Sequence, residues 1–525
     1  MLNKLRQILT EKKLDALLIN STNEFLVEYN ALEENSRYKL TGFSGSTGDA
    51  VVTANEVYLF VDGRYHIQAD NEVDRNIVTV IKLQTGETMI GKLQELLPKN
   101  CKLGMMSKKN SLSRFEEYSK FFNINLINLD PFDEETDLKN ENIEKISDNL
   151  CGLTVEDKLE NLRKHLGNTD AFLITSLEEV SYIFNLRDFS VPYSSKVLRR
   201  AIITKTSSKL YAKNDFEEYK KDLQNIKGKI FVDKKSINMR DYELIEDKAV
   251  QKYCDNNYKI SISSGLKSSK TNAEIEHYKD AFSKTDKTVK AIRQYIEEND
   301  NISEYDIDKK LEEYFLDFGA KSLSFKSIVA KDKNSALAHY SKSSKDEIIK
   351  DGSLILIDCG AYYEGGLATD ITRVFVKGEP TELQKTVYTT VLRAFLRAFN
   401  TKIEAGITSG FDIDNKTREF FKDNNINGFE FNHGLGHGIG VSVHEYPPSL
   451  SCSEMAKVPI HNNMCFTIEP GLYNKDLFGV RLENSCYLEN GQIKSFVKMN
   501  YENKLINYDL MTEQEKIWLK DFEVI

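Results

Sequence analysis

A short segment that occurs twice near the start of the chain constrains the fold more than any other feature of the sequence. Residues 15–21 (DALLINS) and 170–176 (DAFLITS) align without gaps at an offset of 155 and share five of seven residues. Apolar residues with helical spacing precede each segment, and a helix that leads into a short apolar strand is typical of an α/β layer. We therefore predict two similar α/β domains that arose by duplication. The alternative is that unrelated α/β domains begin with similar patterns.

Polar segments indicate where these domains end. Residues 140–157 are polar and charged, which suits a linker, and a Ser-rich junction spans residues 261–270. A long charged helix is predicted over residues 272–298, where it opens the last part of the chain. A chain of 525 residues is long enough for about three domains. We predict an α/β (α+β) protein with domains at residues 1–149, 150–264 and 265–525.

The charge pattern excludes a nucleic-acid binder. Lys and Arg number 71 and Asp and Glu number 81, so the formal net charge is -10, and no concentrated basic run is present. Phosphate neutralisation needs a basic patch, which this pattern does not provide. No stretch approaches the roughly 20 apolar residues that span a bilayer. We therefore expect neither nucleic acid nor a membrane as a partner.

The start of the chain and its cysteines predict a cytoplasmic protein. The amphipathic start, MLNKLRQILTEKKLD, contains acidic residues and lacks the apolar region and the cleavage site of a signal peptide. The seven cysteines are scattered, and no C-x-x-C pair is present. Isolated thiols in a large chain are typical of the reducing cytosol.

Two aspartates lie on neighbouring predicted strands in the last domain. Residues 353–360 form an apolar strand that carries Asp358, and residues 368–376 form a second strand that carries Asp370, with a Gly-rich turn between them. A hairpin of these strands can set the two carboxylates side by side. Unpaired carboxylates in an apolar setting repel each other, and a cation relieves this repulsion. Alternatively, both residues are ordinary turn aspartates without a ligand.

Three histidines follow in a glycine-rich segment. His433, His437 and His444 all lie within residues 432–445. Glycine neighbours let the backbone approach closely and leave room for imidazole rings. A single buried histidine is usually structural, whereas three histidines with glycine spacers more often form a site. The segment therefore indicates metal binding or acid–base chemistry.

Two glutamates lie in apolar runs with the character of strands. A glutamate is rare in such a run unless it is paired or bound to a metal, and both Glu469 and Glu483 occupy one. Alternatively, Glu483 forms an internal ion pair with Arg481, which projects from the same face of its strand. With the aspartates and histidines, the glutamates make an oxygen-rich site, which favours Mn²⁺, Co²⁺ or Zn²⁺. Two such ions ~3.5–4 Å apart can hold a bridging hydroxide and polarise a carbonyl, which is chemistry for hydrolysis.

The order of these residues resembles that of the pita-bread metallopeptidases, which include methionine aminopeptidase, prolidase and aminopeptidase P. Their ligand order of Asp, Asp, His, Glu and Glu falls on Asp358, Asp370, His437, Glu469 and Glu483. The three-domain aminopeptidase P subgroup is similar in four further segments, which are residues 42–48 (GFSGSTG), 62–65 (DGRY), 185–188 (NLRD) and 510–519. The resemblance therefore extends along essentially the whole chain.

The resemblance implies a fold and a pair of metal ions. The implied fold is two creatinase-like N-terminal α/β domains followed by a pita-bread catalytic domain. The implied cofactors are two divalent ions, with Mn²⁺ expected and Zn²⁺ or Co²⁺ as alternatives. Asp358 would bind one ion, and His437 and Glu469 would bind the other. Asp370 and Glu483 would bridge both.

The resemblance also implies the catalytic residues. Glu469 would be the proton shuttle for the attacking hydroxide. His339, in the segment AHY, matches an outer histidine of the family, as do His433 and His444. These three are expected to line the pocket, to orient the proline residue and to stabilise the gem-diolate with fixed donors. The spacing from Asp358 to Asp370 is 12 residues, one more than is usual in the family. We expect the extra residue in the turn at residues 362–367.

The three-domain plan implies an Xaa-Pro aminopeptidase, which hydrolyses the N-terminal residue from peptides with proline in the second position. A peptide bond before proline has no N–H, so peptidases that need that donor fail on it. A homodimer is expected because it is common in the family. One alternative is a prolidase, which cleaves Xaa-Pro dipeptides and would need a basic group for the proline carboxylate. Another is a non-catalytic binding protein on the same scaffold, in which substitutions among the five ligands would be expected.

Overall fold

Two mixed sheets of similar topology are formed by the first half of the chain. The first has the strand order β4-β3-β2-β1-β5-β6, made of β1 (Ala16–Ile19), β2 (Ala50–Thr53), β3 (Val57–Val61), β4 (Thr79–Lys82), β5 (Lys102–Met106) and β6 (Asn123–Ile127). The second has the order β11-β10-β8-β12-β13, made of β8 (Ala171–Ile174), β10 (Arg200–Thr204), β11 (Ser208–Tyr211), β12 (Ile230–Val232) and β13 (Ala249–Gln251).

Strands β1 and β8, which come from the two repeated segments, occupy equivalent places in these sheets. Strand β1 pairs antiparallel with β2 and parallel with β5, and β8 pairs antiparallel with β10 and parallel with β12. Each follows a helix, α1 (Leu2–Lys12) for β1 and α7 (Val155–Arg163) for β8. The prediction of two similar α/β domains is confirmed. The other helices of this part are α2 (Ser36–Thr41), α3 (His66–Glu72), α4 (Met89–Leu96), α5 (Leu112–Tyr118), α8 (Leu177–Ile183), α9 (Phe216–Asn225), α10 (Met239–Glu243) and α11 (Ile262–Ser268).

Strand β1 shows why these segments are apolar throughout. Its side chains alternate between the two faces of the sheet, so Leu17 and Ile19 pack into one apolar cluster, while Ala16 and Leu18 pack into another. A strand that is buried on both faces has no polar positions, in contrast to the alternating pattern of a strand with one wet face. The first sheet is therefore the middle layer of an α/β arrangement.

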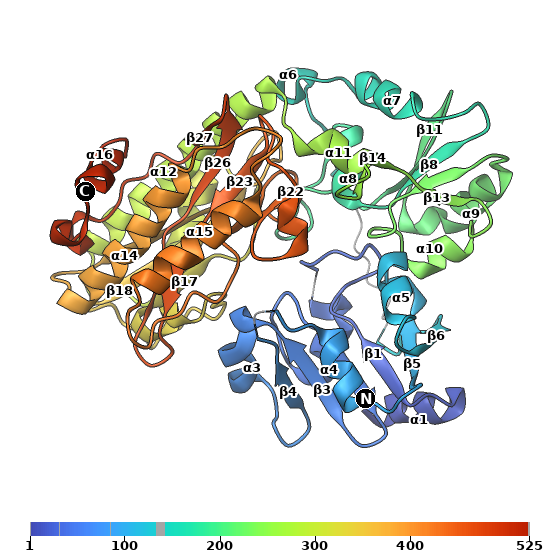
Figure 1. Cartoon of the computed structure of the whole chain (residues 1–525), viewed down its shortest axis with the longest axis horizontal. Coiled ribbons are helices and arrows are strands. Elements are labelled where there is room, and N and C mark those ends of the chain that lie inside the picture. Colours follow the sequence, from blue (N-terminus) through green and yellow to red (C-terminus); the bar gives the residue numbers. More distant parts are fainter. Residues whose placement is uncertain (1, 31, 85, 133–141, 523–525) are drawn as a thin grey trace. The chain divides into compact units, whose positions relative to one another are not determined.

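The computed structural model describes residues 2–30, 32–84, 86–132 and 142–522 (Figure 1). Two compact units divide the chain. The first comprises Met1–Asn140, Val155–Phe184 and Val197–Ser263, and the second comprises Glu141–Thr154, Asn185–Lys196 and Ser264–Ile525. The chain enters the second unit more than once, so the two units do not correspond to consecutive domains. The predicted domain boundaries at 149/150 and 264/265 therefore stay predictions.

Two short segments join the second unit ahead of its main part. Strand β7 (Glu144–Lys145) pairs antiparallel with β9 (Leu186–Arg187), and α6 (Asp148–Cys151) follows β7. The predicted polar linker at residues 140–157 thus contains a strand and a short helix, while its residues 140 and 141 lie outside the described residues. The hairpin of β14 (Tyr253–Asp255) and β15 (Ile260–Ser261) precedes α11.

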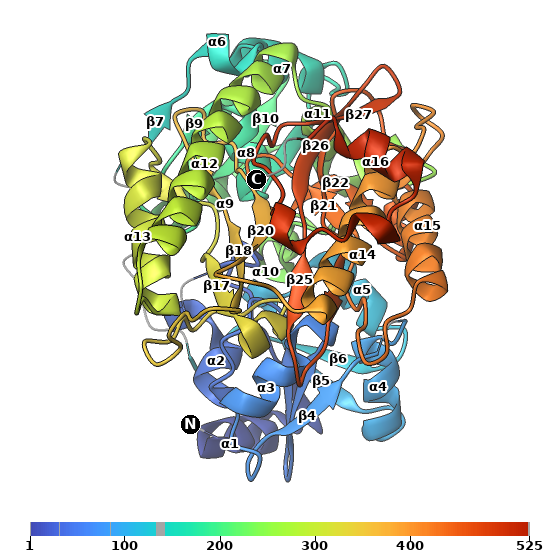
Figure 2. The ribbon, with the colours of Figure 1, turned by 90° about the vertical axis from the view of Figure 1, so that its left-hand side faces the viewer.

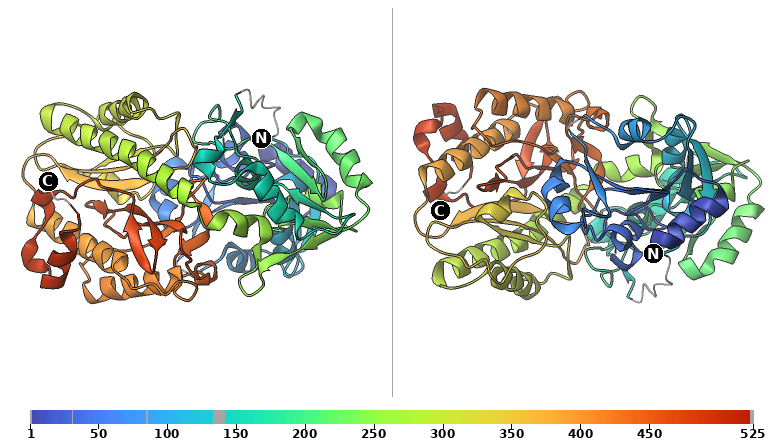
Figure 3. Two further views of the ribbon diagram at one scale, coloured as in Figure 1. Left: turned by 90° about the horizontal axis from the view of Figure 1, so that it is seen from above. Right: turned by 90° about the horizontal axis from the view of Figure 1, so that it is seen from below.

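Two helix pairs flank the strands of the second unit. Figures 2 and 3 show α12 (Asn272–Glu298) and α13 (Glu304–Asp317) on one side of the strands, with α14 (Glu382–Phe399) and α15 (Gly410–Asp423) on the other. Helix α12 spans the predicted residues 272–298 and begins with a capping box between Thr271 and Glu274, so this prediction is confirmed. A short helix, α16 (Glu513–Leu519), ends the described chain. This is the pita-bread arrangement that the resemblance implied.

The strands between the helix pairs form two main antiparallel sheets. One has the order β17-β18-β20, made of β17 (Ile328–Lys331), β18 (Leu354–Cys359) and β20 (Ile371–Val376). The other has the order β22-β21-β23-β26-β27, made of β21 (Gly436–Gly438), β22 (Glu445–Leu450), β23 (Cys465–Ile468), β26 (Asn484–Glu489) and β27 (Gln492–Ser495). Two further pairs are β16 (Ser322–Leu323) with β19 (Ala361–Tyr362), and β24 (Gly471–Tyr473) with β25 (Gly479–Arg481).

A buried arginine joins the two main sheets. Arg373, on β20, donates to the backbone carbonyls of Glu483 (2.7 Å) and Met499 (2.8 Å) and to Asn484 Oδ1 (2.8 Å). Its side chain is fully buried, so these bonds replace the water that the guanidinium loses. They hold the start of β26 against β20. Among the described residues, no helix has both the length and the apolar character needed to cross a membrane.

Candidate metal centre

The hairpin of β18 and β20 brings two aspartates together. The strands pair in continuous register along their whole length, which sets Asp358 opposite Thr372. Asp370 lies two residues before Thr372, so strand alternation directs both side chains to one face. An isolated bridge continues the same register toward the turn, and the connection is therefore residues 363–367, within the predicted turn. The extra residue of this chain leaves the paired strands in register.

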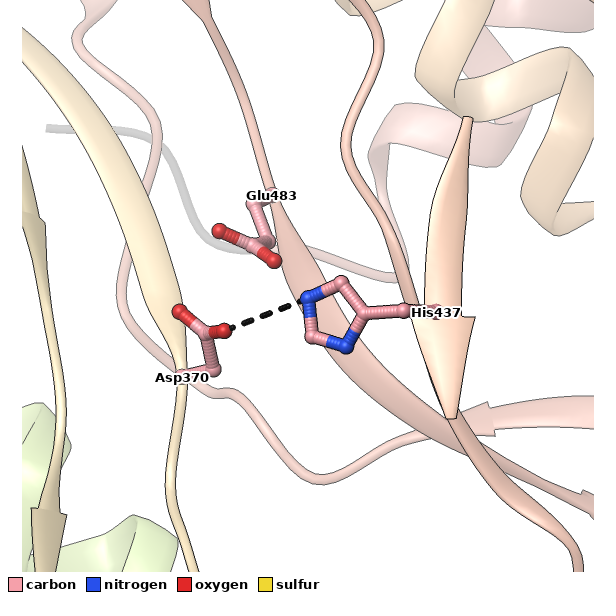
Figure 4. A group of neighbouring side chains, drawn as sticks. All are labelled: Asp370, His437 and Glu483. Atoms are coloured by element: carbon pink, nitrogen blue, oxygen red, sulfur yellow. Dashed lines mark ion pairs between the residues drawn. The ribbon is translucent and has the colours of Figure 1, made fainter. Parts of the chain in front are cut away.

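Three side chains from different strands or strand ends converge beside this hairpin. Asp370, His437 and Glu483 each offer one ligand atom, and these atoms all lie within 4.8 Å of one another (Figure 4). His437 Nε2 lies 3.5 Å from Asp370 Oδ2 and 3.7 Å from Glu469 Oε1. Glu483 follows β25 and is held to β20, because its backbone N–H donates to the Thr372 carbonyl at 3.1 Å.

The proton of His437 is directed away from this group. Its Nδ1 lies 3.0 Å from the carbonyl oxygen of Gly438. A carbonyl can only accept, so Nδ1 carries the proton and Nε2 presents a lone pair. Fixing the tautomer through the second ring nitrogen is the usual way in which proteins prepare a metal-binding histidine.

Three buried carboxylate oxygens in the centre have no hydrogen-bond donor among the described residues: Asp358 Oδ1, Asp370 Oδ1 and Glu483 Oε1. Burial, followed by the charges of neighbouring carboxylates, raises the pKa of Asp370 and of Glu483 well above the ordinary values. Burial also raises the pKa of Glu469. Buried charged oxygens without partners are costly, and a divalent cation removes that cost. The donor set therefore fits hard or borderline divalent metal ions.

Arg481 forms an ion pair with Asp358, whereas its place on the strand had allowed an ion pair with Glu483. An ion pair with Glu483 was the alternative, but Arg481 Nη2 donates to Asp358 Oδ2 at 2.6 Å. Its Nε donates to Thr372 Oγ1 at 3.2 Å, and the Thr372 hydroxyl donates to Glu483 Oε2 at 2.7 Å. The second oxygens of Asp358 and Glu483 are thus held by donors, while the first oxygen of each stays available for a ligand.

His433 is tied to the same network through a tyrosine. Arg481 Nη1 donates to the hydroxyl of Tyr473 at 2.8 Å, and this hydroxyl lies 2.9 Å from His433 Nε2. His433 Nδ1 lies 2.7 Å from the Gly434 carbonyl, which can only accept a proton. The tyrosine hydroxyl therefore donates to His433 Nε2 when the ring is neutral.

The other two predicted histidines differ in how closely the geometry ties them to the centre. The ring of His444 lies edge-on to that of His437, with centroids 4.3 Å apart. His339 lies half-buried in the turn after the 3₁₀ helix Asp332–Ala336, and its place in the pocket stays a prediction. Thr372 and Tyr473 were not foreseen. Strand alternation from Asp370 could have identified Thr372, whereas no local pattern marks Tyr473.

Family models match most of the chain. Residues 276–490 match the model described as metallopeptidase family M24. Residues 1–137 and 134–297 match two models, each described as a creatinase/prolidase N-terminal domain. Together the three models account for both repeated α/β domains and for the part that contains the candidate centre.

Curated relatives are similar over nearly the full length. A protein of Ajellomyces dermatitidis named "Probable Xaa-Pro aminopeptidase P" is 28% identical, and the alignment covers 99% of this chain and 94% of the relative. A protein of Aspergillus fumigatus with the same name is 29% identical over 92% of this chain and 80% of the relative.

Among solved structures, the chain is similar to the X-prolyl aminopeptidase of Caenorhabditis elegans, described as a cytosolic enzyme with a di-nuclear active site. The TM-score is 0.87 at 22% identity, and the match covers 99% of this chain and 94% of that one. At this identity the likeness establishes the fold, which is two α/β domains followed by a pita-bread domain.

Proposed function

Because residues 276–490 match metallopeptidase family M24 and residues 1–137 and 134–297 match creatinase/prolidase N-terminal domains, we propose that the chain is a metal-dependent Xaa-Pro aminopeptidase. It releases the N-terminal residue from peptides with proline in the second position. The observation that carries this proposal is the buried centre, in which three carboxylates keep a free oxygen beside the lone pair of His437. The names of the full-length relatives support the specificity for Xaa-Pro bonds.

The ligand assignment follows the family order. Asp358 would hold one ion, His437 and Glu469 would hold the second, and Asp370 and Glu483 would contribute to both. When bound, a divalent metal pair polarises the scissile carbonyl and lowers the pKa of the attacking water. The free oxygens of Asp358, Asp370 and Glu483 support this assignment, because each is buried and lacks a donor among the described residues.

The remaining chemistry belongs to side chains around the centre. Glu469 takes the proton of the attacking water and passes it to the departing prolyl nitrogen, because its carboxylate, 3.7 Å from His437 Nε2, lies in the centre and can accept a proton and then donate it. His433, His444 and His339 line the pocket, orient the proline residue and donate to the oxygen that gains charge in the transition state.

We also propose which metal the protein binds, in which compartment it acts and how many chains it assembles. The metal is Mn²⁺, with Zn²⁺ and Co²⁺ as the rivals, because carboxylate-rich sites favour hard ions. The protein is cytoplasmic, which the isolated cysteines and the cytosolic relative from Caenorhabditis elegans support. It forms a homodimer. Size-exclusion chromatography with light scattering tests the last point, and elution at the mass of one chain, 60.2 kDa, would remove it.

A prolidase on the same scaffold is the nearest alternative. Both enzymes cleave before proline, and they differ in whether the substrate ends at that proline. A prolidase needs a cation for the proline carboxylate, whereas an aminopeptidase must leave room for the peptide to continue. The full-length similarity to relatives named Xaa-Pro aminopeptidase P favours the aminopeptidase.

The deciding experiment compares two peptides. The purified protein is stripped with a chelator, reloaded with Mn²⁺, Co²⁺ or Zn²⁺, and assayed by mass spectrometry on Arg-Pro-Pro and Gly-Pro. We expect metal-dependent release of Arg from the tripeptide. Cleavage of the dipeptide alone would make the protein a prolidase, and no cleavage with any metal would support the binding-protein alternative.

A further inference from the structure

The loop between β21 and β22 carries His444 and starts next to the metal-binding His437. The two strands form an irregular hairpin, since the register shifts between His437 and Gly438. After the shift, Gly438 pairs with Glu445, the residue that follows His444. The position of the His444 ring relative to His437 therefore depends on how this loop is held.

Glu445 holds the loop from inside. Its Oε2 accepts the backbone N–H of Val441 at 2.9 Å, so the carboxylate closes the turn that leads to His444. Its Oε1 lies 2.5 Å from Lys270 Nζ and 3.7 Å from Lys267 Nζ. The side chains of Glu445 and Lys267 are 1% exposed and that of Lys270 is 3% exposed, so this group is shielded from water.

The same lysines also hold the far end of the loop. Lys267 Nζ donates to the carbonyl of Tyr446 at 3.1 Å, and Ser264 Oγ donates to the same carbonyl at 3.1 Å. Lys270 Nζ donates in addition to the carbonyl of Lys267 at 2.9 Å, which fixes the two ammonium groups relative to each other. Residues 264–270, which lead into α12, thus grip both the carboxylate of Glu445 and the backbone after it.

The space under the loop is filled by the Glu445 carboxylate. A Cβ atom at Gly440 would lie 2.2 Å from Glu445 Oε2, so any side chain there would displace the carboxylate. The carbonyl of Gly440 in turn accepts the N–H of Ala368 at 2.8 Å, two residues before Asp370. The loop is therefore connected to the strand that supplies the first metal ligands as well as to the lysines.

Stability alone does not account for such a group. Burying two lysines and one carboxylate costs hydration free energy, and the attraction between their charges offsets only part of that cost. Apolar residues in the same space often give equal stability. What the charged group does supply is a fixed geometry, since each partner is bound in a directional way. The three charged residues also do not bind the metal themselves, because none of them belongs to the cluster of Asp370, His437 and Glu483.

We propose that Glu445, clamped by Lys267 and Lys270, is a positioning residue that sets the place of the His444 ring against His437. This inference rests on the proposed function, in which His444 acts on the peptide. It predicts that Glu445 influences catalysis only through His444, and that Lys270 acts through Glu445.

The test is a set of variants in the metal-loaded, full-length protein. Glu445→Gln keeps the size of the side chain but weakens its hold on both lysines. We expect kcat to fall about 10–100-fold, as for a misplacement of about 1 Å, with KM changed less than threefold and the metal content unchanged. Lys270→Met should give a similar loss, and Lys270→Arg should restore most of it. The matched control is Glu276→Gln, which removes an exposed carboxylate paired with Lys279 at 2.6 Å and should leave kcat unchanged.

Two measurements separate positioning from a general structural role. In the double variant Glu445→Gln with His444→Ala, kcat should equal that of His444→Ala alone, because the route through His444 is already lost. Additive losses would overturn the proposal. Crystal structures of the metal-free wild type and Glu445→Gln should show the His437–His444 centroid distance increased from 4.3 Å, whereas an unmoved ring would also overturn it. If Glu445→Gln does not fold, the same comparisons are made with Lys270→Met. The crystallographic measurement decides the positioning even if the wild type cleaves no Xaa-Pro peptide, an outcome that would remove the proposed function alone.

Discussion

Each unit of the molecule buries a cluster of charged side chains, and the cluster of the first unit is fully paired. Arg200 Nε lies 2.6 Å from Asp241 Oδ2, and Arg200 Nη2 lies 3.0 Å from Glu24 Oε2. Arg240 Nη2 lies 3.0 Å from Glu24 Oε2 and 3.1 Å from Asp241 Oδ1. Burial alone would raise the pKa of Glu24, but the two arginines outweigh burial and lower it to about 2.

The cluster of the second unit is short of positive charge. Arg481 is paired with Asp358, while Asp370 and Glu483 each keep an oxygen without a donor among the described residues. Their pKa values move upward, in the direction opposite to that of Glu24. Burial is common to both clusters, so burial does not distinguish them. A buried carboxylate cluster that is neutralised by Arg or Lys side chains needs no further cation. A buried cluster with too few such side chains is a site for a bound metal ion.

The largest effect expected from this comparison is at Asp370. Asp370→Asn removes a carboxylate that we propose as a ligand of both ions, and losing about 4 kcal/mol of transition-state stabilisation would lower kcat/KM about a thousandfold. In the metal-free protein the same change relieves repulsion, so the melting temperature should stay equal or rise. Kinetics checks kcat/KM, and calorimetry of the metal-free protein checks the melting temperature, with metal analysis of each sample beside them. A metal-free Asp370→Asn that melts well below the metal-free wild type would contradict the view that the centre lacks cations.

Glu469→Gln separates proton transfer from metal binding within the centre. The amide keeps the shape of the side chain but cannot accept the proton of the attacking water, so kcat should fall about 10²–10⁴-fold. Metal content and fold should be retained. The measurement is steady-state kinetics on Arg-Pro-Pro beside metal analysis of the same sample. Near-normal turnover would show that another group moves the proton.

In the first unit, Arg200→Met should change stability and leave chemistry alone. It leaves Glu24 and Asp241 to share Arg240, and breaking a buried ion pair costs about 3–5 kcal/mol. Calorimetry should show a lowered melting transition, with kcat unchanged at a temperature where the variant is folded. Arg75→Met is the control, since Arg75 is 51% exposed and pairs with Asp70 at 3.3 Å, and it should shift melting little. Equal shifts in both variants would break the comparison.

The smallest effect is a pH dependence at Glu24. Its folded pKa of about 2 lies below its ordinary value of 4.5, so ionised Glu24 stabilises the folded state at pH above 4.5. That contribution, about 3 kcal/mol, disappears as pH falls from 4.5 toward 2. Glu24→Gln should therefore be less stable than wild type at pH 7, and the gap should shrink at pH 3. Denaturant unfolding at both pH values checks this, and a constant gap would argue against the ion pairs as its source.

The fold class and the hairpin that carries Asp358 and Asp370 could be predicted because both depend on local patterns. The apolar segments at residues 15–21 and 170–176 indicate buried strands, and their equivalent pairing in two sheets follows from the same helix–strand order. Strand alternation on β18 and β20 sufficed to place Asp358 near Asp370. These features depend on side-chain period and spacing, which can be seen without knowing what lies across from them.

Other features were decided by tertiary structure alone. Local spacing allowed Arg481 to pair with Glu483, two residues away, but the neighbouring strand brought Asp358 to it instead. Glu445 is bound by Lys270, 175 positions earlier in the chain, and no local pattern in either segment predicts this contact. The sequence by itself determined which apolar segments form buried strands and which residues of a strand share a face. Only the packing of distant segments decided which buried charges meet, because the partner of a charge depends on distance in space and not on distance along the chain.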